Sequence, residues 1–172
     1  MIDLMLNRRS IREFTEEKVS AEDKDKLLKA ALCAPSSMAK YPVEFIVTEN
    51  REVIDELITC KTFGTKALKT ATLVVTVIAD AERSDVWIED ASIAATYMTV
   101  EAEKLGLGMN WIQMRCRTGT HGESSEVEVR KVLNIPEKYG VLAIMAIGHK
   151  AEFPKGYDDS FFRFEKIHTD KF

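Results

Sequence analysis

The sequence has few of the residues that build cross-linked or metal-stabilised proteins. Cysteine occurs three times in 172 residues, at Cys33, Cys60 and Cys116, with no Cys-x-x-Cys pair. An odd number of widely spaced cysteines argues against a disulfide framework and a zinc site. The three histidines are also scattered, without the spacing of metal ligands. We therefore predict no bound metal and a reducing, cytoplasmic environment.

Long apolar runs and an excess of positive charge are missing as well. No run reaches the roughly 18 residues that a membrane-spanning helix needs, and the start of the chain does not have the pattern of a signal peptide. The formal net charge of -4 argues against nucleic acid or an anionic membrane as a partner. With 45% hydrophobic residues and no internal repeat, we expect a single domain over residues 1–172.

The signatures of several enzyme classes are also absent. No Ser-His-Asp or Cys-His set can be assembled from the chain. Gly106 and Gly108 close a predicted helix, whereas the glycines of a dinucleotide-binding fingerprint open one. Cys33, on a predicted helix face, is interpreted as a core residue and not as a nucleophile. We assign no catalytic residue from the sequence.

A cluster of arginines near the start of the chain is the first positive signal. Residues 7–14 contain Arg8, Arg9 and Arg12 together with Ser10. Fixed positive charge and forked donors suit a compact dianion such as a phosphate monoester. Arginine clusters also occur on solvated surfaces that bind nothing. These residues alone leave both interpretations open.

The hydrophobic pattern predicts helices and strands in alternation. Helices are expected over residues 3–9, from Ser20 to just before Pro35, and over 51–60, 85–105 and 126–133; strands are expected over 43–48, 72–79, 109–113 and 141–147. The run at 72–79 is almost entirely β-branched, which is typical of a central strand covered on both faces. Four strands interleaved with helices indicate an α/β sandwich.

Two apolar features of the sequence call for a further packing partner. The predicted helix 85–105 has a second apolar strip at Ile93, Tyr97 and Val100. Either a large monomer or a second subunit could cover this strip, and a short chain favours the dimer. The last residues are too polar to form a core of their own, yet their apolar side chains need a surface to lie on: Phe161, Phe162, Phe164, Ile167 and Phe172.

Three segments of the sequence resemble the FMN-dependent nitroreductase family. They are Arg8–Phe14, the loop and strand Ala34–Val47, and Leu105–Gln113. The resemblance implies an α/β (α+β) nitroreductase-like three-layer sandwich with a central, mostly antiparallel sheet flanked by helices. It further implies a homodimer with flavin at the interface and a C-terminal tail that extends onto the partner subunit.

The same resemblance implies a set of cofactor-binding residues. Arg8 and Ser10 would hold the FMN phosphate, and Arg12 would reach the pyrimidine edge of the ring. Arg9, Gln113, Lys150 and Arg163 are about equally compatible with solvent-facing positions. The full implied set is Arg8, Arg9, Ser10, Arg12, Pro35, Ser36, Ser37, Met38, Tyr41, Ile112, Gln113, Gly148, Lys150 and Arg163.

The resemblance also implies an activity. NADH or NADPH would supply electrons, and FMN would pass them through its N5 atom to a small planar acceptor such as a nitroaromatic or a quinone. A missing catalytic set is compatible with this, because the flavin carries the hydride. A flavin-dependent reductive dehalogenase or enone reductase, a non-catalytic flavin-binding module, and a phosphoanion-binding protein without flavin remain alternatives.

The loop after Pro35 departs from the family pattern. Many relatives have Asn or Gly, then Gln, shortly before a Pro-Trp pair, whereas this chain has Ala39, Lys40 and Tyr41 before Pro42 and Val43. The usual amide contacts of this loop with the ring are therefore missing, and Tyr41 is available to stack on or cap the pocket.

Overall fold

A four-stranded antiparallel sheet forms the centre of the computed structural model, which describes residues 1–172. The sheet consists of β1 (Val43–Thr48), β2 (Leu73–Asp80), β3 (Leu107–Gln113) and β4 (Tyr139–His149). The strand order is β1-β2-β4-β3, and every neighbouring pair is antiparallel. The four predicted strands are confirmed, although β3 begins two residues earlier than expected and β4 is longer at both ends.

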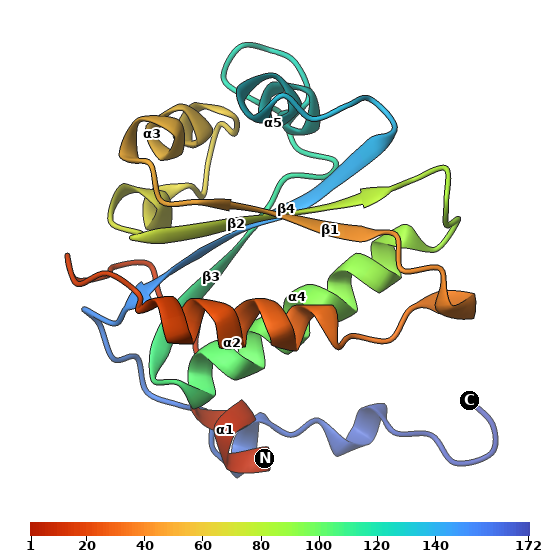
Figure 1. Cartoon of the computed structure of the whole chain (residues 1–172). Helices are drawn as coiled ribbons and strands as arrows, with labels where there is room; N and C mark the ends of the chain where they lie inside the picture. Colours follow the sequence, from red (N-terminus) through yellow and green to blue (C-terminus); the bar gives the residue numbers. More distant parts are fainter.

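Helices cover both faces of the sheet (Figure 1). One layer contains α3 (Arg51–Thr59) and α5 (Ser125–Leu133), and the other contains α2 (Ala21–Leu32) and α4 (Trp87–Lys104). The short helix α1 (Ile2–Asn7) packs against α4. Four 3-10 turns complete the elements: η1 (Ser37–Ala39), η2 (Lys66–Lys69), η3 (Asp159–Phe161) and η4 (Phe164–Lys166). The predicted three-layer sandwich is thereby confirmed.

Each face of the sheet has its own hydrophobic core, because side chains alternate along a strand. On β4, Ile144 belongs to the core under α3 and α5, whereas Met145 belongs to the core over α2 and α4. Almost all of β2 is buried, as its β-branched sequence predicts. No helix combines the length and the apolar character that a membrane crossing requires.

The helix ends follow local chemistry that the sequence partly reveals. The predicted start of α2 is confirmed, since the Ser20 side chain accepts a hydrogen bond from the backbone N–H of Asp23 at 3.0 Å. Gly106 follows α4 with φ of 76°, a conformation that favours glycine. Helix α1 ends at Asn7, so Arg8 and Arg9 lie after the helix and not within its last turn as expected.

The segment that carries the arginines lies across the ends of β3 and β4. Gly108 and Gly148 are direct partners in these two strands. A Cβ atom on Gly108 would lie 2.8 Å from Ile11, and one on Gly148 would lie 2.9 Å from Phe14. The backbone of this segment also bonds to both strands, for example from Ile11 N to the Met109 carbonyl oxygen at 3.1 Å. The absence of side chains at Gly108 and Gly148 thus leaves the space in which the arginine segment, residues 7–14, packs against the sheet.

Substitution of Gly148 by alanine is expected to lower the free energy of unfolding by about 1–3 kcal/mol. The added methyl group would displace Phe14, which is buried. Urea denaturation would measure the change. An unchanged midpoint would show that this contact does not hold the segment.

Candidate functional site

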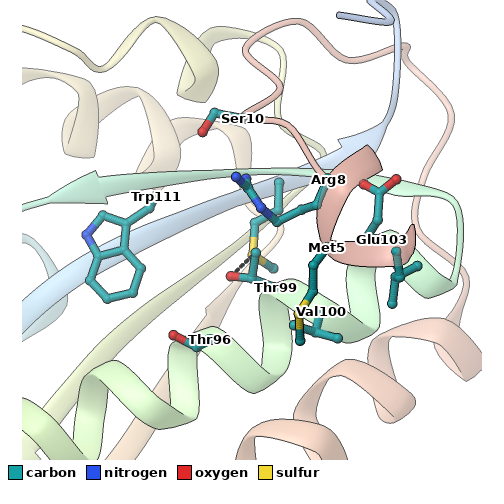
Figure 2. Close-up of a pocket in the computed structure, with 10 residues that line it drawn as sticks. Met5, Arg8, Ser10, Thr96, Thr99, Val100, Glu103 and Trp111 are labelled. Atoms are coloured by element: carbon teal, nitrogen blue, oxygen red, sulfur yellow. Dashed lines mark hydrogen bonds between the residues drawn. The ribbon is translucent and has the colours of Figure 1, made fainter. Parts of the chain in front are cut away.

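A pocket of about 340 Å³ lies between α1, α4 and β3. Its size is in the range of small-molecule sites, which are mostly apolar with a few polar groups. Figure 2 shows the arrangement, with Arg8 between the β3 side and the α4 side. The lining residues are Leu4, Met5, Arg8, Ser10, Thr96, Thr99, Val100, Glu103, Met109 and Trp111.

Arg8 is the cation of this pocket. Helix α1 ends before Arg8, which has an extended backbone with φ of -61° and ψ of 123°. In the view of Figure 2 its guanidinium group lies between Ser10 and Thr99. The one carboxylate in the lining, that of Glu103, is paired with Lys150 at 2.8 Å. Arg8 therefore offers an uncompensated positive charge beside a hydroxyl group, which suits a phosphate.

The Glu103–Lys150 ion pair borders the pocket. Only 11% of the Glu103 side chain and 15% of the Lys150 side chain are exposed, and the Lys150 ammonium donates to both carboxylate oxygens, at 2.9 and 2.8 Å. Lys150, expected to contact phosphate, is thus brought close to the pocket. In the free chain its charge is already balanced by Glu103.

Arg9 and Arg12 do not line the pocket. Arg9 donates to the backbone carbonyl of Lys155, and its guanidinium carbon lies 4.8 Å from the centre of the Tyr157 ring. Arg12 is exposed; its backbone N–H donates to the Glu152 carboxylate at 2.5 Å. Of the expected arginine motif, the structure therefore brings Arg8 and Ser10 together at the pocket and directs Arg9 to the C-terminal tail.

The loop Pro35–Tyr41 is anchored to a buried carboxylate. Asp90, which is 3% exposed, accepts hydrogen bonds from the Ser36 hydroxyl at 3.2 Å and the Ser37 backbone N–H at 2.9 Å. The buried Ser84 hydroxyl donates to the same carboxylate at 3.3 Å. Three donors from two loops thus converge on one side chain of α4.

This loop does not reach the pocket of its own chain. Pro35, Ser36 and Tyr41 border a separate cavity of about 60 Å³, and Met38 is 85% exposed. Asp90 precedes Thr99, at the pocket, by nine residues of α4, which corresponds to about 14 Å along the helix axis. The two halves of the expected site are therefore apart in one chain.

The remaining expected residues lie at varied distances from the pocket. Ile112 belongs to the core under α3 and α5, so its side chain faces away from the pocket that Met109 and Trp111 line. Gln113 accepts from the Trp111 indole N–H at 2.9 Å and donates to the Arg115 carbonyl oxygen at 3.2 Å. Gly148 lies against Phe14.

Helix α4 contributes side chains to the pocket that the sequence motifs did not indicate. Thr96, Thr99 and Glu103 follow one another at steps of three and four residues, so they share one face of the helix. Their polarity, beside the apolar strip through Val100, was a signal available in the sequence. Trp111, one residue before the expected Ile112, was missed because the direction of strand side chains depends on register.

Cys33 and Cys60 lie in different environments. Cys33 is exposed, so its assignment to the core was wrong; it follows the last residue of α2 and lies off the buried face. Cys60 is buried, and burial together with the nearby charge of Glu128 raises the pKa of its thiol to about 12. A thiol protonated at neutral pH is a poor nucleophile.

A three-layer α+β fold with an arginine-bearing apolar pocket defines a class of small-ligand proteins, and comparison with known proteins identifies the family. The sequence profile of the nitroreductase family matches residues 5–61 and 59–149. A protein of Archaeoglobus fulgidus with the provisional name NADH dehydrogenase/NAD(P)H nitroreductase is 32% identical over 99% of this chain and 97% of its own length. The chain belongs to the nitroreductase family, as its motifs predict.

Solved structures agree with this assignment. An FMN-dependent nitroreductase from Clostridium difficile shares 44% identity and a TM-score of 0.97, with all of both chains covered. A structure from Clostridium acetobutylicum, described provisionally as an NADH oxidase, shares 32% identity and a TM-score of 0.89, covering 99% of this chain and 100% of that one. The fold and the oxidoreductase class predicted from the sequence are thereby confirmed.

Proposed function

We propose that this protein is an FMN-dependent oxidoreductase that takes electrons from NADH or NADPH and passes them to a small planar acceptor, such as a nitroaromatic or a quinone. The observation that carries the proposal is the unpaired Arg8, which lies beside Ser10 in a largely apolar pocket of about 340 Å³. A phosphate monoester fits the cation and hydroxyl, and an apolar ring system fits the walls. Bound FMN would supply the hydride chemistry.

The residues of this chain provide binding and orientation. Arg8 and Ser10 are assigned to the phosphate, where each charge-assisted hydrogen bond is worth about 1.5–3 kcal/mol. Val100, Met109 and Trp111 supply the apolar walls. The other residues implied by the resemblance remain proposed contacts: Arg9, Arg12, Pro35, Ser36, Ser37, Met38, Tyr41, Ile112, Gln113, Gly148, Lys150 and Arg163.

A homodimer would bring the two halves of the site together. The strip on α4 is open in the single chain, with Ile93 38% and Tyr97 44% exposed. Beyond Tyr157, every backbone hydrogen bond of the tail joins two tail residues, and Figure 1 shows the tail running past α1 below the α2 and α4 layer. Exposed apolar patches of this kind favour a subunit interface. We propose that the tail and the Pro35–Tyr41 loop pack on a second copy.

Replacing Tyr97 with aspartate is expected to convert the dimer into monomers and to lower the bound flavin. The change buries a charge in the proposed interface, which is strongly unfavourable. Light scattering after gel filtration would report the mass, with Lys29→Gln on the exposed side of α2 as a control that has the same one-unit change of charge. A Tyr97→Asp protein that remains dimeric would remove this strip from the interface.

We also infer one domain over residues 1–172 and a cytoplasmic location. Helices of the same chain cover both faces of the sheet. All three cysteines are free, as a reducing compartment favours.

Anaerobic titration of the purified protein with NADH and with NADPH tests the activity. Bleaching of a flavin absorption band, followed by reoxidation with an added nitroaromatic or quinone, is the expected result. A yellow protein inert to both nucleotides would indicate a non-catalytic flavin-binding module, and a colourless protein would indicate phosphoanion binding without flavin. Reoxidation only by a halogenated aromatic or an enone would favour the dehalogenase or enone reductase alternative.

A further inference from the structure

A second cavity, of about 420 Å³, lies between the loop that follows α3 and the loop that precedes α5. The two loops are tied together, since the Thr62 backbone N–H donates to the Thr118 carbonyl oxygen at 3.1 Å and the Thr62 hydroxyl donates to the same oxygen at 2.9 Å. The lining residues are Lys61, Thr62, Phe63, Gly64, Arg117 and Thr118. None of them borders the pocket of Arg8.

Two cations face this cavity without an acidic partner. Partial burial lowers the pKa of Lys61, and the positive charge of Arg117 lowers it further. The carboxylates of the following segment are engaged elsewhere: Glu123 pairs with Lys131, Glu126 accepts from the Cys116 N–H, and Glu128 accepts from the His121 N–H. Holding two like charges together is unfavourable in the free protein, and an anion between them would remove that cost.

An aromatic ring accompanies the two cations. Phe63 is 81% exposed, although phenylalanine is usually buried. Its position before Gly64, which has φ of 85°, places it in a tight turn at the cavity. Exposed aromatic rings beside basic side chains are typical of surfaces that stack a base and bind its phosphates.

The cavity belongs to the α3 and α5 side of the sheet and the Arg8 pocket to the α2 and α4 side, so a ligand that joins them would pass the edge strand β3. Arg117 follows Trp111 by six residues, and an extended chain of six residues spans at most about 20 Å. An extended dinucleotide is of comparable length. We propose that the Lys61–Arg117 cavity binds a phosphate group of the nicotinamide nucleotide that reduces the enzyme, with Phe63 available to the adenine. This inference rests on the proposed function.

Titration calorimetry on the flavin-loaded protein tests the site without turnover. The probes are adenosine 2′,5′-bisphosphate, which carries the phosphate found in NADPH, and ADP, which carries the diphosphate common to NADH and NADPH. In the Lys61→Gln/Arg117→Gln protein, the dissociation constant of at least one probe should rise by about tenfold or more. The flavin content should be unchanged. Phe63→Ala should weaken both probes. Lys131→Gln/Lys138→Gln removes the same two charges outside the cavity and should leave binding unchanged.

The two probes show which phosphate group of the nucleotide the cavity binds. Weakening of the bisphosphate alone assigns the cavity to the 2′-phosphate, and weakening of ADP, alone or together with the bisphosphate, assigns it to the diphosphate. Unchanged binding of both, or no binding to the unmodified protein, overturns the proposal. Failure of NADH and NADPH to bleach the flavin would instead refute the proposed activity, because the calorimetry does not depend on electron transfer.

Discussion

Alanine at Arg8 is expected to release most of the bound FMN. Arg8 is the unpaired cation of the pocket, and the loss of two charge-assisted hydrogen bonds would cost about 3 kcal/mol or more. Since 1.4 kcal/mol corresponds to about tenfold in affinity, the dissociation constant should rise by about two orders of magnitude. The ratio of flavin to protein absorbance after gel filtration would measure the effect.

A matched arginine provides the control for this result. Arg83 is exposed in a turn after β2 and does not line the pocket, so Arg83→Ala should retain its flavin. Lysine at position 8 should retain part of the binding, because a point charge replaces the forked donor. Full flavin content in the Arg8→Ala protein would exclude this pocket as the phosphate site.

Alanine at Asp90 is expected to destabilise the fold and to disturb the Pro35–Tyr41 loop. Asp90 is the common acceptor of the Ser36 hydroxyl, the Ser37 N–H and the Ser84 hydroxyl. A buried donor left without a partner costs about 1–3 kcal/mol, and Ser84 is 1% exposed. We expect a loss of about 3 kcal/mol in the free energy of unfolding by urea denaturation, together with lower flavin content.

A milder variant, Asp90→Asn, and a control, Asp85→Ala, test whether the loss of stability comes from the buried acceptor. Asp90→Asn keeps one carbonyl oxygen as an acceptor and should be less destabilising than Asp90→Ala. Asp85 lies close by in sequence, is exposed and pairs with Lys40 at 3.6 Å; surface pairs of this kind contribute little, so Asp85→Ala should have little effect. If Asp90→Ala unfolds at the same urea concentration as the unmodified protein, this carboxylate does not anchor the loop.

The anchored loop also carries the main departure from the family pattern. Met38, Ala39 and Tyr41 have φ of 51°, 53° and 45°, values at which glycine and asparagine are favoured. Glycine or asparagine would suit this backbone better than Ala39 does. The hydrogen bonds to Asp90 offset part of this conformational cost.

Local patterns predicted most of the fold. The β-branched run of β2 and the Ser20 cap of α2 depend on neighbours in sequence, and both agree with the structure. Arg8 and Ser10 could be assigned together because they lie two residues apart. Arg9 could not be assigned in this way, since its partners Lys155 and Tyr157 come from the other end of the chain.

Long-range contacts explain what the sequence did not predict. Trp111 faces the pocket on the α2 and α4 side of the sheet and Ile112 faces the core under α3 and α5, because a difference of one residue in a strand reverses the face. The separation of the Pro35–Tyr41 loop from the pocket follows from the position of Asp90 on α4. The spacing of residues within a motif predicts neither relation.

The arginine segment packs against Gly108 and Gly148, so it can reach its folded position only after β3 and β4 have been made. The ribosome makes Arg8 and Ser10 well before β3 and β4, the strands that hold them in place. Contacts between the two ends of a chain form late, because closing so large a loop costs entropy before any contact compensates for it. A nascent chain would therefore be unable to hold the phosphate at Arg8 and Ser10 until β4 has been made, so that cofactor loading follows folding.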